Sequence, residues 1–525
     1  MILRARFWQN WQQWNWWRLL LIIVLALGIC FRLVNLDRKV YWEDEAATSL
    51  RISGYSKIEF VEQTYNAPPI TVGELRQKYL TPNPSKNLGD TLQVLMGKAE
   101  HTPLYYLLAR FWAQLVGSSP AEMRLLPALI SLWAFPAMYW LCLELFASPL
   151  IAAIAVALIA VSPLHILYAQ EARQYSLWIV TILVSTAQLL RALRVPTKAS
   201  WIIYALTVIW GLYSHLFYLF IALSHGIYVL VLTIKRSTHQ LVNYLVASTA
   251  AIGAFIPWLL ALFNYANTSP YWQSINKALG REISLLELLD RWLRNVNRIF
   301  HDADLGLANL ILFLFAAGAI YFVCRHAPPQ IWWLILTLFG VTALVLVLPD
   351  LIIGGQRSVR TRYLIPCALS IELAVAYLLA IQLTTSVRIW QQRIWRLVLT
   401  VLILAGVVSG AITAQAESAW SKDINTTKYY PRMARAINAA GAPLVITDGE
   451  ETNILSLTYL LNPEVKIQFL KWPHPISPLD SRANQIFLLD ASQELRGKLQ
   501  QEQHITLEAI VDTKKANLWL VKGSY

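Results

Sequence analysis

The feature that most constrains this chain is a series of long apolar runs separated by short polar links. A helix that crosses the hydrocarbon core of a bilayer needs about 17 to 25 mostly apolar residues, and somewhat shorter runs are tolerated. The sequence predicts an α-helical polytopic membrane protein with about eleven such spans. The runs cover residues 19–36, 125–146, 150–165, 175–193, 200–214, 216–234, 241–263, 306–323, 331–349, 363–384 and 396–413.

Composition agrees with this class, because 56% of the residues are hydrophobic and only 14% are charged. The net charge of +13 comes from Lys and Arg in short links rather than in blocks, so it is read as an orientation signal and not as a nucleic-acid-binding surface. The four cysteines lie inside apolar runs or at their ends, which predicts neither disulfides nor a zinc site. Within residues 1–18, Trp8, Trp11, Trp14 and Trp17 recur every three residues, which favours an interfacial segment before an uncleaved first span. A helix packed on the rest of the protein is the alternative.

The segment PLYYLLARFWAQLVG, at 103–117, decides the sidedness of everything after it. If it is not a span, nearly every basic link lies in the cytoplasm with the N-terminus, as the positive-inside rule requires. We therefore expect 103–117 to be a helix that lies along the outer face or dips into it. The exception to the rule is GGQRSVRTRY, at 354–363, whose three arginines then lie outside and are suited to binding an anion.

An odd number of spans also places the chain end outside. From about residue 415, helix-like and strand-like patterns alternate, which predicts a small extracytoplasmic α/β domain over 415–525. The predicted organisation is an interfacial segment at 1–18, a membrane domain at 19–414 with its first outer loop at 37–124, and this α/β domain. The last contains neither a GxGxxG motif nor a P-loop, so no nucleotide site is predicted there.

With this topology five polar motifs fall on the outer face: EDE (43–45), EHTPLYY (100–106), QEARQY (170–175), YSH (213–215) and QRSVRTRY (356–363). Each has a simpler interpretation as a helix cap, a loop residue or a packing contact. Glu372 and His225, inside spans, are interpreted as satisfied contacts between helices and are left out of the site. The convergence on one side is what indicates a site.

Such a set of groups suits group transfer. A carboxylate can take the proton from an acceptor hydroxyl that attacks an anomeric carbon, while arginines and a histidine neutralise a phosphate leaving group. No nucleoside triphosphate is expected outside the cell, so the donor should be lipid-linked, with its phosphate at headgroup level.

At these residues the sequence resembles the GT-C superfamily of membrane glycosyltransferases, specifically the group of family 39 protein-mannosyltransferases, aminoarabinose transferases and Rgt-type enzymes. The resemblance covers roughly 15–385. It is carried, in order, by WEDEA, HTPLYYLLARFWAQLVG with MRLLPALISLWAFPAMYWL, SPLHILYAQEARQYSL, YSHLFYLF and RSVRTRYLIPC. It implies an inverting transfer of a hexose or pentose from a polyprenyl-phosphate sugar, in the bacterial inner membrane.

Carried over residue by residue, the resemblance makes Asp44 the base or acceptor-orienting group and Glu45 its partner. Ala47 stands where aminoarabinose transferases carry an arginine, which puts that substrate in doubt and assigns the donor phosphate to His101, Arg173, Arg357, Arg360 and Arg362. Further site candidates are Glu100, Tyr105, Gln170, Glu171, Tyr175, His215 and Tyr363. Some relatives bind a divalent metal, for which Glu100 and His215 would be the ligands here.

Two other functions stay open at this point. A transporter or flippase of a lipid-linked saccharide would use the same arginines without chemistry, and would be expected to show internal repeats and polar groups deep in the spans. Alternatively, the outer α/β domain does the work, although eleven spans are far more than an anchor needs. The acceptor, whether a lipid, a glycan or a protein, and the sugar are not specified by any residue.

Overall fold

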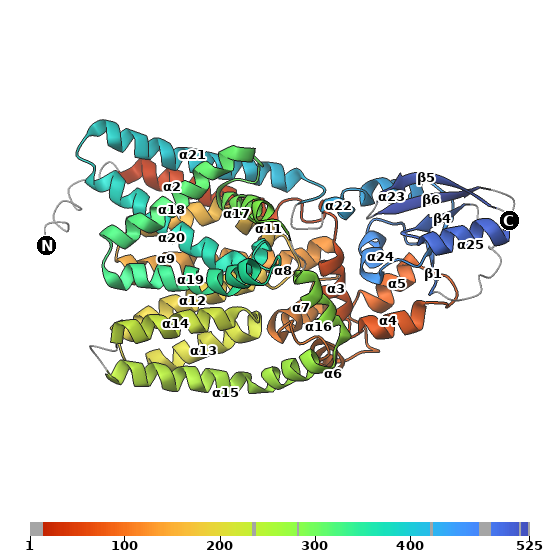
Figure 1. Cartoon of the computed structure of the whole chain (residues 1–525), viewed down its shortest axis with the longest axis horizontal. Coiled ribbons are helices and arrows are strands. Elements are labelled where there is room, and N and C mark those ends of the chain that lie inside the picture. Colours follow the sequence, from red (N-terminus) through yellow and green to blue (C-terminus); the bar gives the residue numbers. More distant parts are fainter. Residues whose placement is uncertain are drawn as a thin grey trace. The chain divides into compact units, whose positions relative to one another are not determined.

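The computed structural model describes residues 14–233, 238–280, 283–419, 424–471, 485–503, 505–513 and 516–522 (Figure 1). Each predicted span coincides with a helix. These are α2 (Trp14–Leu33), α8 (Pro120–Leu132) with α9 (Ala134–Phe146), α10 (Pro149–Val161) with α11 (Pro163–Ala169), α12 (Tyr175–Arg194), α13 (Lys198–Ser214), α14 (Tyr218–Thr233), α15 (Thr238–Thr268), α18 (Asn309–His326), α19 (Pro329–Ile352), α20 (Ile365–Thr385) and α21 (Ile389–Gln415). The predicted class, an α-helical polytopic membrane protein, is confirmed.

Among the described residues, seven helices are long and apolar enough to cross a membrane, and an eighth span is formed if α10 and α11 are counted together. That pair bends by 59° at Ser162, where Pro163 follows and removes a backbone donor. The predicted spans at 200–214 and 216–234 fall on helices of 17 and 16 residues. The prediction of about eleven spans is therefore roughly consistent with the helices; the difference lies in the short α13 and α14, the bent pair and α2, which is not among the seven.

The segment 103–117 forms helix α7 (Pro103–Leu115). Its 13 residues rise about 20 Å in all, which is well short of the roughly 30 Å hydrocarbon core. A helix of this length agrees with the prediction that the segment does not span. Its orientation along the outer face stays a prediction.

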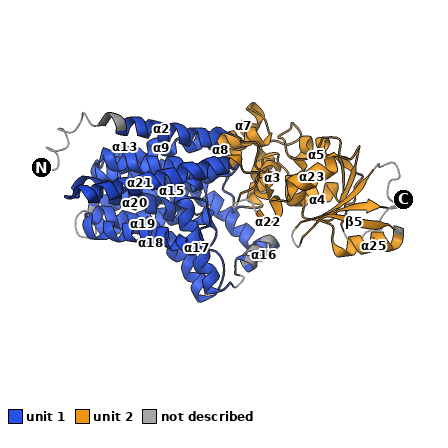
Figure 2. Cartoon of the chain, turned by 90° about the horizontal axis from the view of Figure 1, so that it is seen from above, with its two compact units in different colours: residues 1–34, 99–104, 127–414 blue, residues 35–98, 105–126, 415–525 orange. Residues whose placement is uncertain are grey.

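The chain divides into two compact units that do not follow chain order (Figure 2). The first contains residues 1–34, 99–104 and 127–414, and thus most of the apolar helices, together with α16 (Pro270–Leu279), α17 (Leu285–Phe300), η2 (Gly306–Ala308) and η3 (Thr361–Leu364). The second contains 35–98, 105–126 and 415–525. Residues of the first outer loop thus share a compact unit with the α/β segment, whereas the predicted domains had placed that loop in the membrane domain.

The first outer loop and the α/β segment share a unit because both contribute to one six-stranded sheet. Its strand order is β1-β3-β2-β4-β6-β5. The strand-like patterns of the C-terminal segment form β2 (Leu444–Thr447), β3 (Lys466–Phe469), β4 (Ile486–Leu489), β5 (Thr506–Asp512) and β6 (Asn517–Lys522). The sixth, β1 (Ile70–Thr71), comes from the first outer loop and pairs antiparallel with β3. Strand β2 is parallel to both β3 and β4, and the other pairs are antiparallel.

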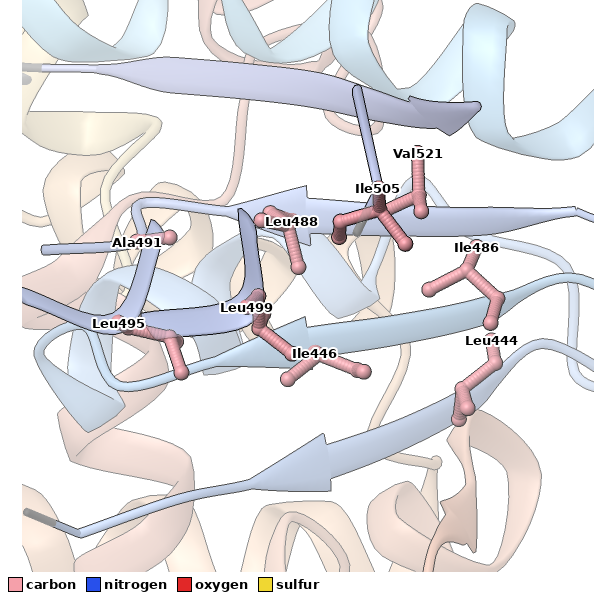
Figure 3. Close-up of a cluster of buried hydrophobic side chains, with 9 residues drawn as sticks. All are labelled: Leu444, Ile446, Ile486, Leu488, Ala491, Leu495, Leu499, Ile505 and Val521. Carbon is pink, nitrogen blue, oxygen red and sulfur yellow. The ribbon is translucent and has the colours of Figure 1, made fainter. Parts of the chain in front are cut away.

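Alternate residues of the sheet build its core. Leu444, Ile446, Ile486 and Leu488 are all buried and form one cluster with Leu495 and Leu499 of α25 (Gln493–Gln503) (Figure 3). The two leucines of α25 are four residues apart and so lie on one helix face. The remaining helices of this unit are α3 (Glu43–Ile52), α4 (Lys57–Thr64), α5 (Val72–Tyr79), α6 (Leu88–Met96), α22 (Ile424–Thr427), α23 (Tyr430–Asn438) and α24 (Glu451–Thr458).

Candidate functional site

Helix α3 places three carboxylates at its start. Glu43, Asp44 and Glu45 occupy its first turn, where the unpaired backbone N–H groups of a helix favour negative charge. The backbone N–H of Trp42 donates to Glu45 Oε2 at 3.3 Å, so the third acid caps the helix. The start of helix α3 therefore gives the three acidic residues a local structural reason for their position.

Glu45 is also half of a buried ion pair. Arg124 Nε donates to Glu45 Oε1 at 2.7 Å and Arg124 Nη2 donates to Oε2 at 2.6 Å, and both side chains are essentially inaccessible to solvent. The same guanidinium donates to the backbone carbonyls of Leu36, Lys39 and Val40 at 2.7 to 2.8 Å. This bidentate pair fixes the entry into α3. A catalytic role for Glu45 stays a prediction, and its geometry gives it a structural role.

Asp44 differs from its neighbour, because it is only half-buried. Thr48 Oγ1 donates to the Asp44 backbone carbonyl at 2.9 Å, which stabilises the first turn that carries the carboxylate. Tyr105, another predicted residue in this unit, is fully buried and stacks edge-on against Tyr106 with ring centroids 5.8 Å apart.

In the first unit, Glu100 and His101 contact each other. His101 Nε2 lies 3.5 Å from Glu100 Oε1, and Tyr265 of α15 donates its hydroxyl to Glu100 Oε2 at 3.2 Å. Trp258 Nε1, from the same helix, donates to the carbonyl of Ala99 at 2.9 Å. Helix α15 therefore holds this predicted pair in place.

His215 is the point at which three predicted motifs of the first unit meet. Its ring stacks on Trp178 at 4.0 Å, lies 6.2 Å from the Tyr175 ring, and accepts the Phe217 backbone N–H at Nδ1 over 3.1 Å. Burial lowers the pKa of His215 to about 3, and the positive charges of Arg173 and Arg362 act in the same direction. The imidazole is therefore neutral, and because Nδ1 accepts, its proton is on Nε2.

The three arginines of the link at 354–363 differ in their contacts and exposure. Arg357 Nη1 lies 3.1 Å from Asp350 Oδ1, and the backbone N–H and hydroxyl of Ser358 both donate to Oδ2 at 2.7 Å, so Arg357 is committed to holding the link. Arg360 is exposed. Arg362 lies against the Tyr363 ring at 5.5 Å, and that ring contacts Phe217 at 4.7 Å.

Helix α17 carries residues that the sequence did not single out. Asn295 Nδ2 donates to the Val359 carbonyl at 3.1 Å, and Arg298 Nη1 donates to Thr361 Oγ1 at 3.2 Å. Arg298 and Arg362 are both close enough to Tyr168 for their charges to act on it. The signal available in the sequence was the amphipathic pattern LLELLDRWLRNVNRIF, which holds three arginines next to the apolar runs.

The remaining predicted residues have structural partners. Gln170 Nε2 donates to the carbonyls of Phe31 and Val34 at the end of α2, at 2.8 and 2.9 Å. Glu171 accepts the Arg173 backbone N–H through its own carbonyl. Within the described part of the chain, no group of three or more His, Cys, Asp and Glu is arranged to hold a metal ion. Glu100 pairs with His101, and His215 stacks on Trp178.

The two groups left out of the site are contacts between helices, as expected. His225 interacts through its two ring nitrogens with Thr186 and Tyr204, each at 3.1 Å. Glu372 pairs with His165 at 3.0 Å. His165 was not singled out by sequence, although it follows Pro163 at the break between α10 and α11.

No protein-family model and no curated protein sequence matches the chain. Solved structures do. ArnT from Cupriavidus metallidurans bound to undecaprenyl phosphate aligns with 97% of this chain and 98% of its own at 11% identity and a TM-score of 0.56. The same protein in the apo state aligns with 95% and 97%, at 11% identity and a TM-score of 0.55. The chain has the GT-C fold.

A second neighbour supports the same conclusion. The apo oligosaccharyltransferase from Archaeoglobus fulgidus aligns with 87% of this chain and 65% of its own, at 13% identity and a TM-score of 0.50. The resemblance to the GT-C superfamily, which the sequence motifs predicted, is confirmed at the level of the fold. A fold hosts many functions, so the activity has to be argued from the residues themselves.

Proposed function

We propose that this protein is an inverting glycosyltransferase that moves a sugar from a polyprenyl-phosphate donor to an acceptor hydroxyl at the outer face of the bacterial inner membrane. The N-terminus would be cytoplasmic and the α/β segment extracytoplasmic. The observation that carries the proposal is the meeting of Arg173, Arg362 and the neutral His215, which come from three separate sequence motifs. A cationic, aromatic-lined group of this kind suits an anionic leaving group.

In the proposed step, Asp44 accepts the proton of the acceptor hydroxyl as its oxygen forms a bond to the anomeric carbon. The bond from that carbon to the phosphate oxygen breaks, and the polyprenyl phosphate leaves with the electron pair. Arg173 and Arg362 stabilise the charge that develops on the phosphate, and the Nε2–H of His215 is a further donor for it. The bound undecaprenyl phosphate of the ArnT neighbour supports this class of donor.

Asp44, rather than Glu45, is proposed as the base because of their environments. A carboxylate held by two short hydrogen bonds from a guanidinium is a poor proton acceptor, since the proton would have to displace a cation. Asp44 is half-buried one residue earlier in the same turn, at a helix N-terminus, where negative charge is favoured.

The proposal is tested by incubating the purified full-length protein with labelled polyprenyl-phosphate sugars and hydroxyl acceptors. We expect Asp44→Asn to lower the transfer rate about 10²- to 10⁴-fold, the range typical of a lost general base. Glu43→Gln is the matched control, because it removes a neighbouring carboxylate that has no assigned role, and it should retain wild-type activity within a few-fold. An Asp44→Asn protein as active as the wild type would contradict the mechanism. Binding without turnover by the wild-type protein would favour a transporter.

A further inference from the structure

A small open pocket lies in the second unit, and none of the carboxylates of α3 lines it. It has a volume of about 330 Å³ and lies between the loop before α6 and the C-terminal half of α7. Its lining combines two cations, Lys86 and Arg110, with polar amides and several apolar side chains. The full lining is Pro82, Asn83, Pro84, Lys86, Asn87, Leu88, Arg110, Phe111 and Gln114.

Arg110 lines this pocket and has only 3% of its surface exposed. Its Nη1 donates to Thr91 Oγ1 at 3.0 Å and to the Ile52 carbonyl, and its Nη2 donates to the Lys86 carbonyl at 2.6 Å. All three acceptors are neutral, and no carboxylate among the described residues forms an ion pair with this guanidinium. Burial lowers its pKa, although the nearby Asp90 partly opposes this. A buried guanidinium is stabilised when an anion compensates it.

Lys86 adds a second positive charge at the rim. Its ammonium contacts Glu59 Oε1 at 2.7 Å and lies 4.8 Å from the centre of the Tyr55 ring. The contact with Glu59 raises the pKa of Lys86, so the ammonium stays charged throughout the physiological range. Glu59 and Asp90 both act on these cations, but neither carboxylate lines the pocket, where the charged side chains are Lys86 and Arg110.

Helix α7 continues from the pocket as an exposed apolar stripe. Leu108, Phe111 and Leu115 are 40%, 50% and 85% exposed, and their spacing of three and four residues puts them on one helix face. Phe111 belongs both to this stripe and to the pocket lining. An apolar stripe that ends in a cationic pocket matches a ligand with an apolar part and an anionic head.

We propose that this pocket binds the phosphate headgroup of an anionic phospholipid, whose acyl chains lie along the Leu108–Phe111–Leu115 stripe of α7. Lys86 and Arg110 provide the charge that recognises the phosphate, and Asn83, Asn87 and Gln114 surround it with hydrogen-bonding groups. The stripe selects a lipid over a free phosphate ester, because a soluble anion would leave three large apolar side chains in water. The site is independent of the proposed transferase reaction and would anchor the first outer loop at the membrane surface.

The test uses the full-length protein, stripped of lipid in detergent, and native mass spectrometry to measure the affinity for added phosphatidylglycerol. Phosphatidylcholine and glycerol 3-phosphate are the comparison probes. We expect phosphatidylglycerol to bind more tightly than either, and Lys86→Gln to weaken its binding about fivefold, the effect of one lysine near an anionic headgroup. The matched control is Lys78→Gln, which removes the same charge from an exposed position of the same loop outside the pocket.

Arg110 itself is a poor choice for substitution, because it also ties Ile52 and Lys86 to α7 and its loss could unfold the loop. Phe111→Ser instead tests the stripe, and it should weaken phosphatidylglycerol binding while leaving the melting temperature unchanged. If Lys86→Gln and Lys78→Gln lower the affinity equally, the pocket does not recognise the headgroup and the proposal is wrong. If glycerol 3-phosphate binds as tightly as phosphatidylglycerol, the site is one for a soluble phosphate and the lipid assignment is wrong.

Discussion

Two acidic side chains of the second unit, one buried and one half-buried, are compensated in different ways. Glu45, at the start of α3, faces a guanidinium that donates to both of its oxygens. Asp490, just after β4, accepts the backbone N–H of Asn517 at 2.9 Å, and no ion pair involves it among the described residues. Burial accordingly raises the pKa of Asp490 to about 6, which the one hydrogen bond only partly opposes.

The difference shows why burial of a carboxylate does not by itself indicate catalysis. Glu45 is the more deeply buried and lies inside the motif that predicted the site, yet its charge is fully used by Arg124 and the helix N-terminus. Asp490 has the perturbed pKa that often marks a functional site, yet it lies at a turn where its positive φ of 44° serves the connection from β4 to α25. The contacts of each carboxylate have to decide: Arg124 engages Glu45 with two hydrogen bonds, and the half-buried Asp44 is the proposed base.

The largest expected effect comes from breaking the Glu45–Arg124 pair. Glu45→Gln would leave a buried guanidinium without its counter-charge, and we expect the free energy of unfolding to fall by about 3 to 5 kcal/mol. Thermal unfolding of the full-length protein in detergent measures this. Glu43→Gln, in the same turn but outside the pair, should change stability by less than about 0.5 kcal/mol. Equal stability of the two variants would mean that the pair contributes nothing.

Asp350, in the first unit, is intermediate between Glu45 and Asp490. Its side chain is buried and has an ion-pair partner, but that partner, Arg357, is 26% exposed. Asp350→Asn keeps one oxygen acceptor for Ser358 and loses the charge that holds Arg357. We expect a loss of about 1 to 3 kcal/mol and a weaker affinity for the polyprenyl-phosphate donor, because the link that carries Arg362 would loosen. Unfolding and donor-binding assays on the same preparation check both. A stable variant with unchanged donor affinity would show that this link is held by α17 alone.

Whether a structural feature could be predicted from the sequence depended on how far apart in the chain its interacting residues lie. The spans and the strands of the α/β segment follow from local patterns such as LVIT and IFLL, and they were predicted. The two-residue strand β1 has no pattern of its own, because it is defined only by its pairing with β3, almost 400 residues later. Likewise Arg124 directly precedes the predicted span at 125–146, and only the fold brings it to Glu45, 79 residues away.

The candidate site shows the same limit. Motifs predicted that Arg173, His215 and Arg362 belong together, and in the first unit the charges of both arginines act on His215. The motif could not separate Arg357 from Arg362, since alternate positions of one link look equivalent until Asp350 takes one of them. Nor could it place Asn295 and Arg298 of α17, whose contacts with Val359 and Thr361 join segments more than 60 residues apart.

The smallest expected effect is a gain of stability at Asp490. Because its folded-state pKa of about 6 lies above the ordinary value of 3.8, the folded protein binds this proton more tightly than the unfolded chain does. Stability at this group is therefore greatest below about pH 4, falls as the pH rises to about 6, and stays low above that. Asp490→Asn removes the charge, keeps the oxygen that accepts the Asn517 N–H, and tolerates the positive φ. We expect it to gain about 1 kcal/mol at pH 7.5 and nothing at pH 4, measured by thermal unfolding at the two pH values. An equal gain at both would assign the effect to packing rather than to charge, and Asp490 would then resemble Glu45 in having its charge compensated.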